Sequence, residues 1–384
     1  MTGLEIVILA LLALVTIVVA INMSAGPFLA SEGAPSAKPL VSVLIPARDE
    51  EHVLPSCLAA LKNQTYANVE IIVCDDHSTD GTEAAVLAAQ REDARLRLVK
   101  GRPLPEHWTG KNWACAQLAR ASRGEILLFL DADVVPGPHS VEQTVAALER
   151  TGADALSAFP EQRLTTPEAK AIIPMMDVLL YCFLPLQLVF RTRFPSLVAA
   201  NGQWIAFTRP VYEAIGTHEA VRAEVVEDMA LARRVKERGK KFFLCSGADT
   251  VVCRMYTTLG EIVEGFSKNF YAGFGQRTIL FVGILALFVL LFVIPPAGIV
   301  FSQAPFFLLG TLLNLIFRSM LSWRLHHGAL SVVLHPVGAL AAVIIGLNGV
   351  RLAKLQGSVR WKGREISVAA RPHDRTQGGP HHGC

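Results

Sequence analysis

The chain has 384 residues, of which 52% are hydrophobic and 18% are charged, whereas soluble domains average roughly 25% charged residues. This composition excludes an intrinsically disordered protein, a disulfide scaffold and a collagen-like fibre, and it favours one domain accompanied by membrane segments. The formal net charge of +3 is too small to predict a nucleic-acid partner.

The first predicted element is an apolar helix over residues 4–21, interrupted only by Glu5. At about 1.5 Å per residue, such a run can cross a hydrocarbon core of roughly 30 Å. A signal peptide is the alternative, but it requires a basic start, and no Lys or Arg precedes Leu4. We therefore predict an uncleaved transmembrane anchor over residues 1–23 and a Pro- and Gly-rich linker over residues 24–39.

Short apolar segments alternate with helix-like segments from residue 40 to about residue 160. This alternation predicts an α/β domain with a mostly parallel sheet, which binds ligands at the carboxyl ends of its strands. We expect the domain to span residues 40–277. Its first predicted elements are strand 41–45, helix 51–61, strand 69–74, helix 82–90, helix 114–121 and strand 126–130.

Acidic side chains follow the predicted strands. Asp75 and Asp76 come after the second strand, where they could cap a turn or accept a hydrogen bond from a uracil ring. Asp131 and Asp133 follow segment 126–130, and two carboxylates at the end of an apolar strand are costly unless a charged group neutralises them. A hard divalent cation that bridges phosphate oxygens would do so, and ordinary turn carboxylates are the alternative.

A second acidic pair, Glu227-Asp228, begins a helix-like segment. The two carboxylates could simply favour a helix N-terminus. Next to the Asp131 and Asp133 pair, however, we interpret Asp228 as a general base that accepts a proton during a reaction.

Five motifs in chain order resemble those of a family 2 glycosyltransferase with the GT-A fold, and together they cover roughly residues 40–250: IPARDEE, DDHSTDGT, WTGKNWA, FLDADV and VVEDMALARRVKERGKK. Three further strings are similar to membrane glycosyltransferases of isoprenoid lipids, such as hopene-associated and carotenoid (diaponeurosporenoate-type) enzymes: LPEHWTGKNWACAQ, MYTTLGEIVEGFSKNFYAGF and RWKGREISV. The ending WKGR is also similar to ceramide glucosyltransferases.

The resemblance implies roles on the donor side of an active site. Asp75 or Asp76 would contact the uracil, and Lys111 would lie near the diphosphate. Asp131 would bind the nucleotide-sugar and, together with Asp133, a Mg²⁺ or Mn²⁺ ion. The remaining residues that would line the nucleotide pocket are Pro46, Arg48 and Glu50.

The resemblance also implies a catalytic pair and an acceptor side. Asp228 would be the catalytic base, with Glu227 beside it. Weaker candidates for the acceptor side are Gln203, Trp204, Trp361 and Arg364, and Trp204 could equally be a core residue.

The resemblance has one departure. Processive members carry a Q-x-x-R-W signature before the C-terminal hairpin. Here Gln276 and Arg277 are adjacent and no Trp follows them, which favours the transfer of a single sugar over the synthesis of a polymer.

Residues 278–350 are predicted to form a C-terminal membrane region. The uncharged stretch 278–317 is twice the length of one span and contains turn signals at Pro295-Pro296 and at 302–305, so we predict a helical hairpin. The basic loop 318–327 favours the cytoplasmic side. The third apolar run, 329–350, contains His335-Pro336 and could either cross the membrane or enter and return.

Two further segments, the tail and an apolar stretch inside the domain, are also expected to lie at the membrane. The basic tail 351–384, with a disordered end, is predicted to stay in the cytoplasm, because a full crossing by 329–350 would export its charges. Segment 172–190 is apolar but contains Pro174, Pro185 and Asp177, and we interpret it as a membrane-surface segment that borders an acceptor path. A buried helix pair is the alternative for 172–190.

Together, the residues and the resemblance predict an inverting, metal-dependent glycosyltransferase, anchored in the cell membrane by several spans, with a cytoplasmic catalytic domain. It would move one sugar from a nucleotide-sugar, such as a UDP-sugar, to a hydroxyl of a membrane isoprenoid lipid such as a carotenoid or hopanoid. The alternatives are a polyprenyl phosphate, glycerolipid or sphingolipid acceptor, and a non-catalytic membrane scaffold that retains a sugar-nucleotide fold. No nucleic-acid partner is expected.

Overall fold

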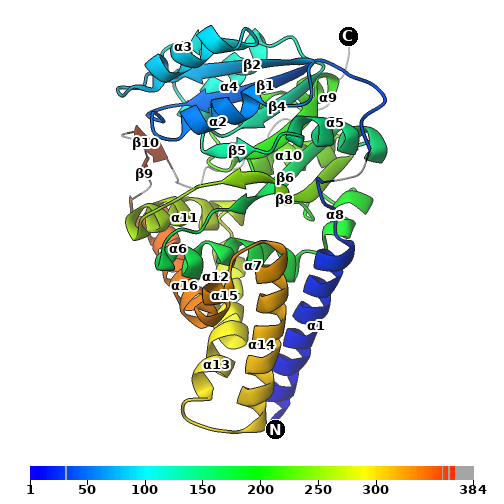
Figure 1. Cartoon of the computed structure of the whole chain (residues 1–384). Coiled ribbons are helices and arrows are strands. Elements are labelled where there is room, and N and C mark those ends of the chain that lie inside the picture. Colours follow the sequence, from blue (N-terminus) through cyan, green and yellow to red (C-terminus); the bar gives the residue numbers. More distant parts are fainter. Residues whose placement is uncertain (31–32, 357, 362–363, 368–384) are drawn as a thin grey trace, which may run out of the picture.

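The computed structural model describes residues 1–30, 33–356, 358–361 and 364–367, and its side chains are described as far as residue 355. A sheet flanked by helices forms the upper part of the molecule in Figure 1, and long helices form the lower part. The strands of the main sheet are β1 (Val41–Ala47), β2 (Val69–Asp75), β3 (Leu96–Lys100), β4 (Ile126–Leu130), β5 (Val134–Pro136), β6 (Ala155–Gln162), β7 (Trp204–Thr208) and β8 (Phe242–Cys253).

The main sheet is mixed. Its strand order is β3-β2-β1-β4-β7-β6-β8-β5. The first four strands in this order are parallel, as the alternating pattern predicts, whereas β7 is antiparallel to both of its neighbours and β5 is antiparallel to β8. The prediction of an α/β domain is therefore confirmed, with the parallel part confined largely to the segment that the sequence pattern covered.

Shorter helices connect the strands, and those at residues 167–183 and 259–273 lie between the sheet and the long lower helices (Figure 1). They are α2 (Leu54–Lys62), α3 (Thr82–Glu92), α4 (Gly110–Ala121), α5 (Ser140–Thr151), α6 (Pro167–Ile172), α7 (Pro174–Phe183), α8 (Leu186–Arg191), α9 (Arg209–Ala214), a 3-10 turn at His218–Val221, α10 (Glu227–Glu237) and α11 (Leu259–Gly273). Strands β1 and β2 are almost wholly buried, and Ala47 pairs with Asp75 at their carboxyl ends. The segments that follow these parallel strands therefore emerge at one edge of the sheet.

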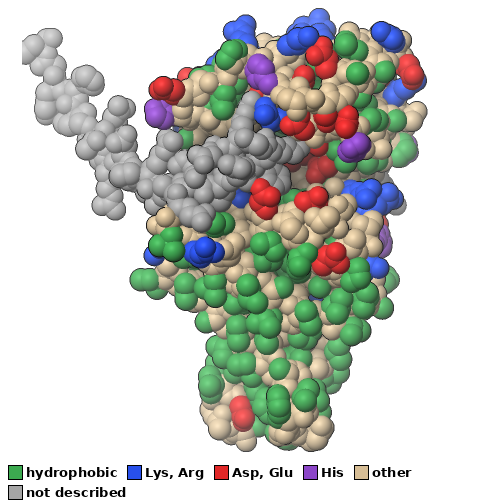
Figure 2. Space-filling model, turned by 90° about the vertical axis from the view of Figure 1, so that its left-hand side faces the viewer, with side chains coloured by type: hydrophobic (Ala, Val, Ile, Leu, Met, Phe, Trp, Pro, Cys, Tyr) green, Lys and Arg blue, Asp and Glu red, His purple; other side chains and the backbone are tan. Residues whose placement is uncertain are grey.

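Among the described residues, four helices are long and apolar enough to cross a membrane: Gly3–Ala25, Thr278–Gly298, Pro305–Arg324 and His335–Leu355. Hydrophobic side chains dominate the lower half of the face drawn in Figure 2. Helix α1 (Gly3–Ala25) packs one face, including Leu12 and Val19, inside the structure and exposes Leu4, Leu14 and Ile17. These features indicate a membrane protein.

The predicted hairpin is present, but its turn lies later than expected. Helices α12 (Thr278–Phe288) and α13 (Ile294–Gly298) are joined by a π-helical turn, Val289–Val293, so the chain remains helical through Pro295-Pro296. Pro295 has no N–H for the backbone oxygen of Leu291, four residues earlier, and Asn314 Nδ2 donates to that oxygen at 2.9 Å instead. Helix α14 (Pro305–Arg324) returns along α1 (Figure 1), so most of the predicted loop 318–327 is helical.

The third apolar run contains α15 (Ala329–Val333) and α16 (His335–Arg351), and both of its ends contact the helices beneath the sheet. Before α15, His327 Nε2 lies 3.1 Å from Asp177 Oδ2 of α7. Near the end of α16, Asn348 Nδ2 donates to Ser267 Oγ of α11 at 3.0 Å. Segment 325–351 thus begins and ends on the same side of the molecule.

The chain continues from α16 through a π-helical turn, Leu352–Gln356, into an antiparallel pair of strands, β9 (Ser358–Trp361) and β10 (Arg364–Ser367). Trp361 pairs with Arg364 in the backbone register. The acceptor contacts predicted for these two residues fall on side chains outside the described part of the chain. The predicted disordered end of the tail also lies outside the described residues.

Candidate active site

A cavity of about 1820 Å³ opens at the carboxyl edge of the parallel strands and continues down to the apolar helices below the sheet. The segments after β1 and β4 form its upper wall, together with the N-termini of α4 and α10. Residues of α7, α11 and α12 form its lower wall. Acidic side chains gather around a recess in the upper part of the face shown in Figure 2.

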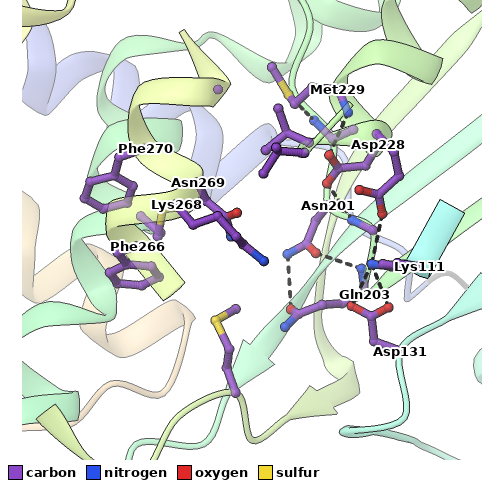
Figure 3. A pocket seen from close by; sticks show the side chains of 18 of the residues that line it. Lys111, Asp131, Asn201, Gln203, Asp228, Met229, Phe266, Lys268, Asn269 and Phe270 are labelled. Carbon is purple, nitrogen blue, oxygen red and sulfur yellow. Dashed lines mark hydrogen bonds and ion pairs between the residues drawn. The ribbon is translucent and has the colours of Figure 1, made fainter. Parts of the chain in front are cut away.

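Lys111 links two acidic segments at the centre of the cavity (Figure 3). It lies in the first turn of α4, whose N-cap is Thr109. Its Nζ is 2.8 Å from Asp131 Oδ1 and 3.0 Å from Glu227 Oε1. Burial would lower the pKa of Lys111, but the two carboxylates outweigh burial and hold it well above its usual value. The ammonium therefore remains charged between the two carboxylates.

Glu227 is buried at the start of α10. Burial would raise the pKa of its carboxyl, but the Lys111 ammonium lowers it below the usual value. Glu227 is therefore the ionised partner of Lys111, and its negative charge acts on the neighbouring Asp228.

Asp228 is held by two backbone N–H groups. Its Oδ2 accepts from the N–H of Gly202 at 2.8 Å, and its Oδ1 accepts from the N–H of Met229 at 2.7 Å. Burial and the charge of Glu227 nevertheless raise the pKa of Asp228 to about 7. A fixed carboxyl whose pKa is close to neutrality is suited to accept a proton from a bound group.

Asp131 and Asp133 flank Ala132 between β4 and β5, and all three residues line the cavity. Asp133 Oδ1 is buried and has no hydrogen-bond partner among the described residues. Burial, followed by the charges of Asp131 and Glu50, raises the pKa of Asp133 to about 7. Two adjacent carboxylates, one with an unsatisfied buried oxygen, fit the oxygen ligands that a hard divalent cation requires.

The predicted nucleotide-site residues also lie along the cavity, with one exception. Pro46, Arg48, Glu50 and Asp76 line its upper wall, and Arg48 Nη1 donates to the backbone oxygen of Asp76 at 2.8 Å. Asp75 is not among the lining residues, and its Oδ1 accepts from the N–H of Ser78 at 3.1 Å. Of the two alternatives for a contact with uracil, Asp76 is the one at the cavity.

The loop that carries Gly202 contains a residue at the cavity and a residue of the core. Gln203 lines the cavity and donates from Nε2 to Cys253 Sγ at 3.0 Å. The prediction that Trp204 faces the acceptor or donor is wrong, because this side chain is 0% exposed and donates to Thr144 Oγ1 at 3.0 Å. Strand β7 lies between β4 and β6 with both of its faces buried, so a side chain on either face at its start enters the core.

Lys268 of α11 is a cavity residue that the sequence analysis did not identify. Figure 3 shows its side chain extending from α11 toward the loop of Asn201 and Gln203. Burial lowers the pKa of Lys268 to about 8, although the charge of Glu227 opposes this change. Lys268 shares its helix face with Glu261 and Glu264, which also line the cavity, and such a charged face in the sequence is typical of an ordinary solvated helix.

The lower wall of the cavity is apolar. Leu180 and Phe183 of α7 face it, as do Leu280, Ile284 and Leu287 of α12. Most residues of α7 are buried, so segment 172–190 lies between the sheet domain and the membrane helices rather than on an open surface. The same segment borders the cavity, and its role as one side of an acceptor path stays a prediction.

The family model "Glycosyl transferase family 2" matches residues 42–213. The 4,4'-diaponeurosporenoate glycosyltransferase of Staphylococcus haemolyticus is 26% identical over 241 residues, which cover 61% of this chain and 61% of the relative. An Escherichia coli enzyme named UDP-Glc:alpha-D-GlcNAc-diphosphoundecaprenol beta-1,3-glucosyltransferase is 30% identical over 109 residues, covering 28% of this chain and 41% of the relative. The chain thus spans less than two thirds of the length of either relative.

Among solved structures, the mannosyltransferase PcManGT from Pyrobaculum calidifontis, determined with GDP-Man and Mn²⁺, superposes with a TM-score of 0.50 at 19% identity. The superposition covers 91% of this chain and 93% of that chain. This similarity concerns the fold alone. With the family match, it confirms the predicted GT-A domain with apolar helices at both ends.

Proposed function

We propose, from the family 2 glycosyltransferase domain that residues 42–213 form, that the protein moves one sugar from a nucleotide-sugar to a hydroxyl of a membrane isoprenoid lipid. The observation that carries the proposal is the continuity of the cavity. One space joins the acidic site at Asp131 and Asp228 to apolar side chains of α7 and α12. A lipid acceptor needs such a path, because its hydroxyl must reach the sugar while its hydrocarbon remains in an apolar environment.

On the donor side, we assign Pro46, Arg48, Glu50 and Asp76 to the nucleotide, and Asp76 to the uracil of a UDP-sugar. Lys111 lies within reach of this wall and would stabilise the charge that develops on the diphosphate.

Asp131 and Asp133 would hold a Mg²⁺ or Mn²⁺ ion, since the unsatisfied oxygen of Asp133 fits a hard cation. A bound divalent cation supplies Lewis-acid stabilisation of the departing diphosphate.

At the reacting centre, we assign Asp228 as the general base. The acceptor oxygen forms a bond to the anomeric carbon while the bond from that carbon to the diphosphate oxygen breaks, and Asp228 takes the hydroxyl proton. Attack from the face opposite the leaving group inverts the configuration. The N–H groups of Gly202 and Met229 fix the carboxylate for this transfer, and Glu227 holds the Lys111 ammonium.

The direct test uses purified protein in lipid nanodiscs with radiolabelled UDP-hexoses and either a hydroxylated carotenoid or a hopanoid alcohol. We expect one sugar per lipid, in the inverted anomeric configuration by NMR. A non-catalytic scaffold would show neither transfer nor hydrolysis of the UDP-sugar. A product with several sugars would contradict the prediction drawn from the adjacent Gln276 and Arg277.

A phosphate-bearing lipid is the second candidate acceptor, and the position of Lys268 favours it. This side chain lines the cavity, as do Arg233 and Arg254. Cationic groups there would suit a polyprenyl phosphate, and the name of the Escherichia coli relative includes a diphosphoundecaprenol. Parallel assays with a carotenol and with a polyprenyl phosphate distinguish the two acceptors.

The rate of transfer should depend on pH through Asp228. The base must be deprotonated to accept a proton, so kcat/KM for the acceptor should rise with pH, by about tenfold per pH unit on the acid side, and level off near pH 7, where the pKa of Asp228 lies. In Glu227→Gln, a negative charge that raises this pKa is removed, so the rise of kcat/KM with pH should occur at lower pH. The control is Glu224→Gln, which replaces an exposed acid three residues earlier and should leave the pH dependence unchanged.

We further propose that the protein spans the membrane several times, with its catalytic domain and tail in the cytoplasm. The return of segment 325–351 to the helices beneath the sheet supports this topology. With Cys384 removed, Ser367→Cys should resist a membrane-impermeant thiol reagent in intact cells and react after lysis. Ser302→Cys, in the exposed turn between α13 and α14, should react in intact cells. Labelling at position 367 in intact cells would place the tail outside.

A further inference from the structure

The lower wall of the cavity contains a break between α7 and α8. Helix α7 ends at Phe183 and α8 begins at Leu186, with Pro185 between them. Proline has no N–H, so the backbone oxygen of Tyr181, four residues earlier, lacks its helical donor. The break shapes the cavity, because Leu180, Phe183 and Leu184 all line it.

Asn22, from the last part of α1, satisfies the backbone groups that this break exposes. Its Nδ2 donates to the backbone oxygens of Tyr181 at 2.8 Å and Leu184 at 3.0 Å. Its Oδ1 accepts from the N–H of Leu186 at 3.1 Å. The side chain is 1% exposed, so all three bonds lie where no bulk water can replace them, and leaving these groups unpaired would be costly.

The segment around Asn22 is also fixed to the sheet domain. Gln187 Nε2 of α8 donates to the backbone oxygen of Ala25 at 2.7 Å. The N–H of Ser246 in β8 donates to the backbone oxygen of Pro27 at 2.9 Å, and the backbone oxygen of Ser246 accepts from the N–H of Leu29 at 2.8 Å. The end of α1 is therefore held against the sheet. The hydrogen bonds from Asn22 in turn hold the α7–α8 break against the end of α1.

We propose that Asn22 is a positioning residue for the lipid acceptor. It holds the α7–α8 break in the geometry that forms the apolar cavity wall, so the N-terminal helix takes part in acceptor recognition as well as in anchoring. Asn22 is not among the lining residues of the cavity and acts through Tyr181, Leu184 and Leu186. This inference rests on the proposed function, which places the hydrocarbon of the acceptor against this wall.

The test compares Asn22→Leu with Thr16→Val in nanodiscs. Thr16 Oγ1 donates to the backbone oxygen of Leu12 within α1, at 2.8 Å, so its replacement controls for a change in the same helix. Asn22→Leu should raise the KM for the lipid acceptor on the order of tenfold, while the KM for the donor and the rate of donor hydrolysis stay unchanged. Deuterium exchange of the backbone over residues 181–190 should also increase. Thr16→Val should resemble the wild type in every measurement.

A double variant separates positioning from stability. Pro185→Ala returns an N–H to the backbone oxygen of Tyr181, so Asn22→Leu/Pro185→Ala should recover thermal stability, even if Asn22→Leu alone folds poorly. The acceptor KM should remain high, because a continuous helix no longer forms the break. An acceptor KM at the wild-type value in the folded double variant, or in Asn22→Leu itself, would overturn the role of Asn22. A wild-type protein that transfers sugar to no lipid would instead overturn the proposed function, and this inference with it.

Discussion

The Asp228→Asn variant is expected to transfer sugar on the order of 10²–10⁴ times more slowly than the wild type, the usual contribution of a positioned base. Asparagine has nearly the same shape, and its oxygen can keep one of the two backbone bonds from Gly202 and Met229. Its amide cannot take the proton of the acceptor. Single-turnover transfer measures the chemical step, and titration with UDP measures donor binding, which should be nearly unchanged.

The control for this variant is Glu237→Gln, which removes an exposed carboxylate at the other end of α10. It should transfer sugar at the wild-type rate. An equal loss of donor affinity and transfer rate in Asp228→Asn would show that the carboxylate is structural. A phosphate acceptor gives a different result, because its oxygen is already deprotonated and the rate would then fall only slightly.

Glu227 and Asp228 are adjacent in sequence but have different environments. Lys111 lies between Asp131 and Glu227 and keeps Glu227 ionised, whereas burial and the charge of Glu227 raise the pKa of Asp228. One acid of the pair therefore holds a cation while the other is able to accept a proton. The sequence predicted the pair and the role of Asp228 as the base, and the physical reason for that role lies in the position of Lys111, which is more than a hundred residues earlier.

The pattern of strands predicted that the acids after three of them would meet, and Glu50, Asp76, Asp131 and Asp133 do line one cavity, although Asp75 does not. Parallel strands end at one edge, so acids that follow β1, β2 and β4 had to lie near one another. The burial of Trp204 was not predictable in this way, since it depends on the position of β7 between β4 and β6, where both faces of the strand are buried. The structure starts β7 at Trp204 and directs this side chain to Thr144 in the core.

Long-range contacts account for the features that the sequence did not reveal. Asn22 and Tyr181 are 159 positions apart, and no local pattern connects a polar residue at the end of an apolar helix with a proline break. Likewise, the length of run 329–350 is compatible with crossing or returning. The contacts of its two ends with α7 and α11 place both ends on one side of the molecule, and these contacts depend on the packing of the whole chain.

The Asp133→Ala variant is expected to lose sugar transfer and metal-dependent UDP binding, because a single carboxylate cannot replace two at a site for a divalent cation and a diphosphate. Its fold should nevertheless be retained. Asp133 Oδ1 has no hydrogen-bond partner among the described residues, and its pKa of about 7 reflects burial first and repulsion by Asp131 and Glu50 next. Removing such a group relieves an unfavourable burial, so the metal-free variant should unfold at the wild-type temperature or above it.

Thermal unfolding with and without Mn²⁺ plus UDP measures both effects in one experiment. A ligand that binds only the folded state raises the free energy of unfolding, by about 2.7 kcal/mol at a hundredfold excess over Kd. The unfolding temperature therefore rises as well. The wild type and the control Glu106→Gln, which alters an exposed acid in the loop before α4, should show this increase. Asp133→Ala should begin at an equal or higher temperature and show none. Because transfer is lost while stability does not fall, the loss of transfer cannot come from unfolding. Wild-type transfer that persists in EDTA, or an Asp133→Ala variant that Mn²⁺ plus UDP still stabilises, would show that the two carboxylates do not hold a metal needed for the reaction.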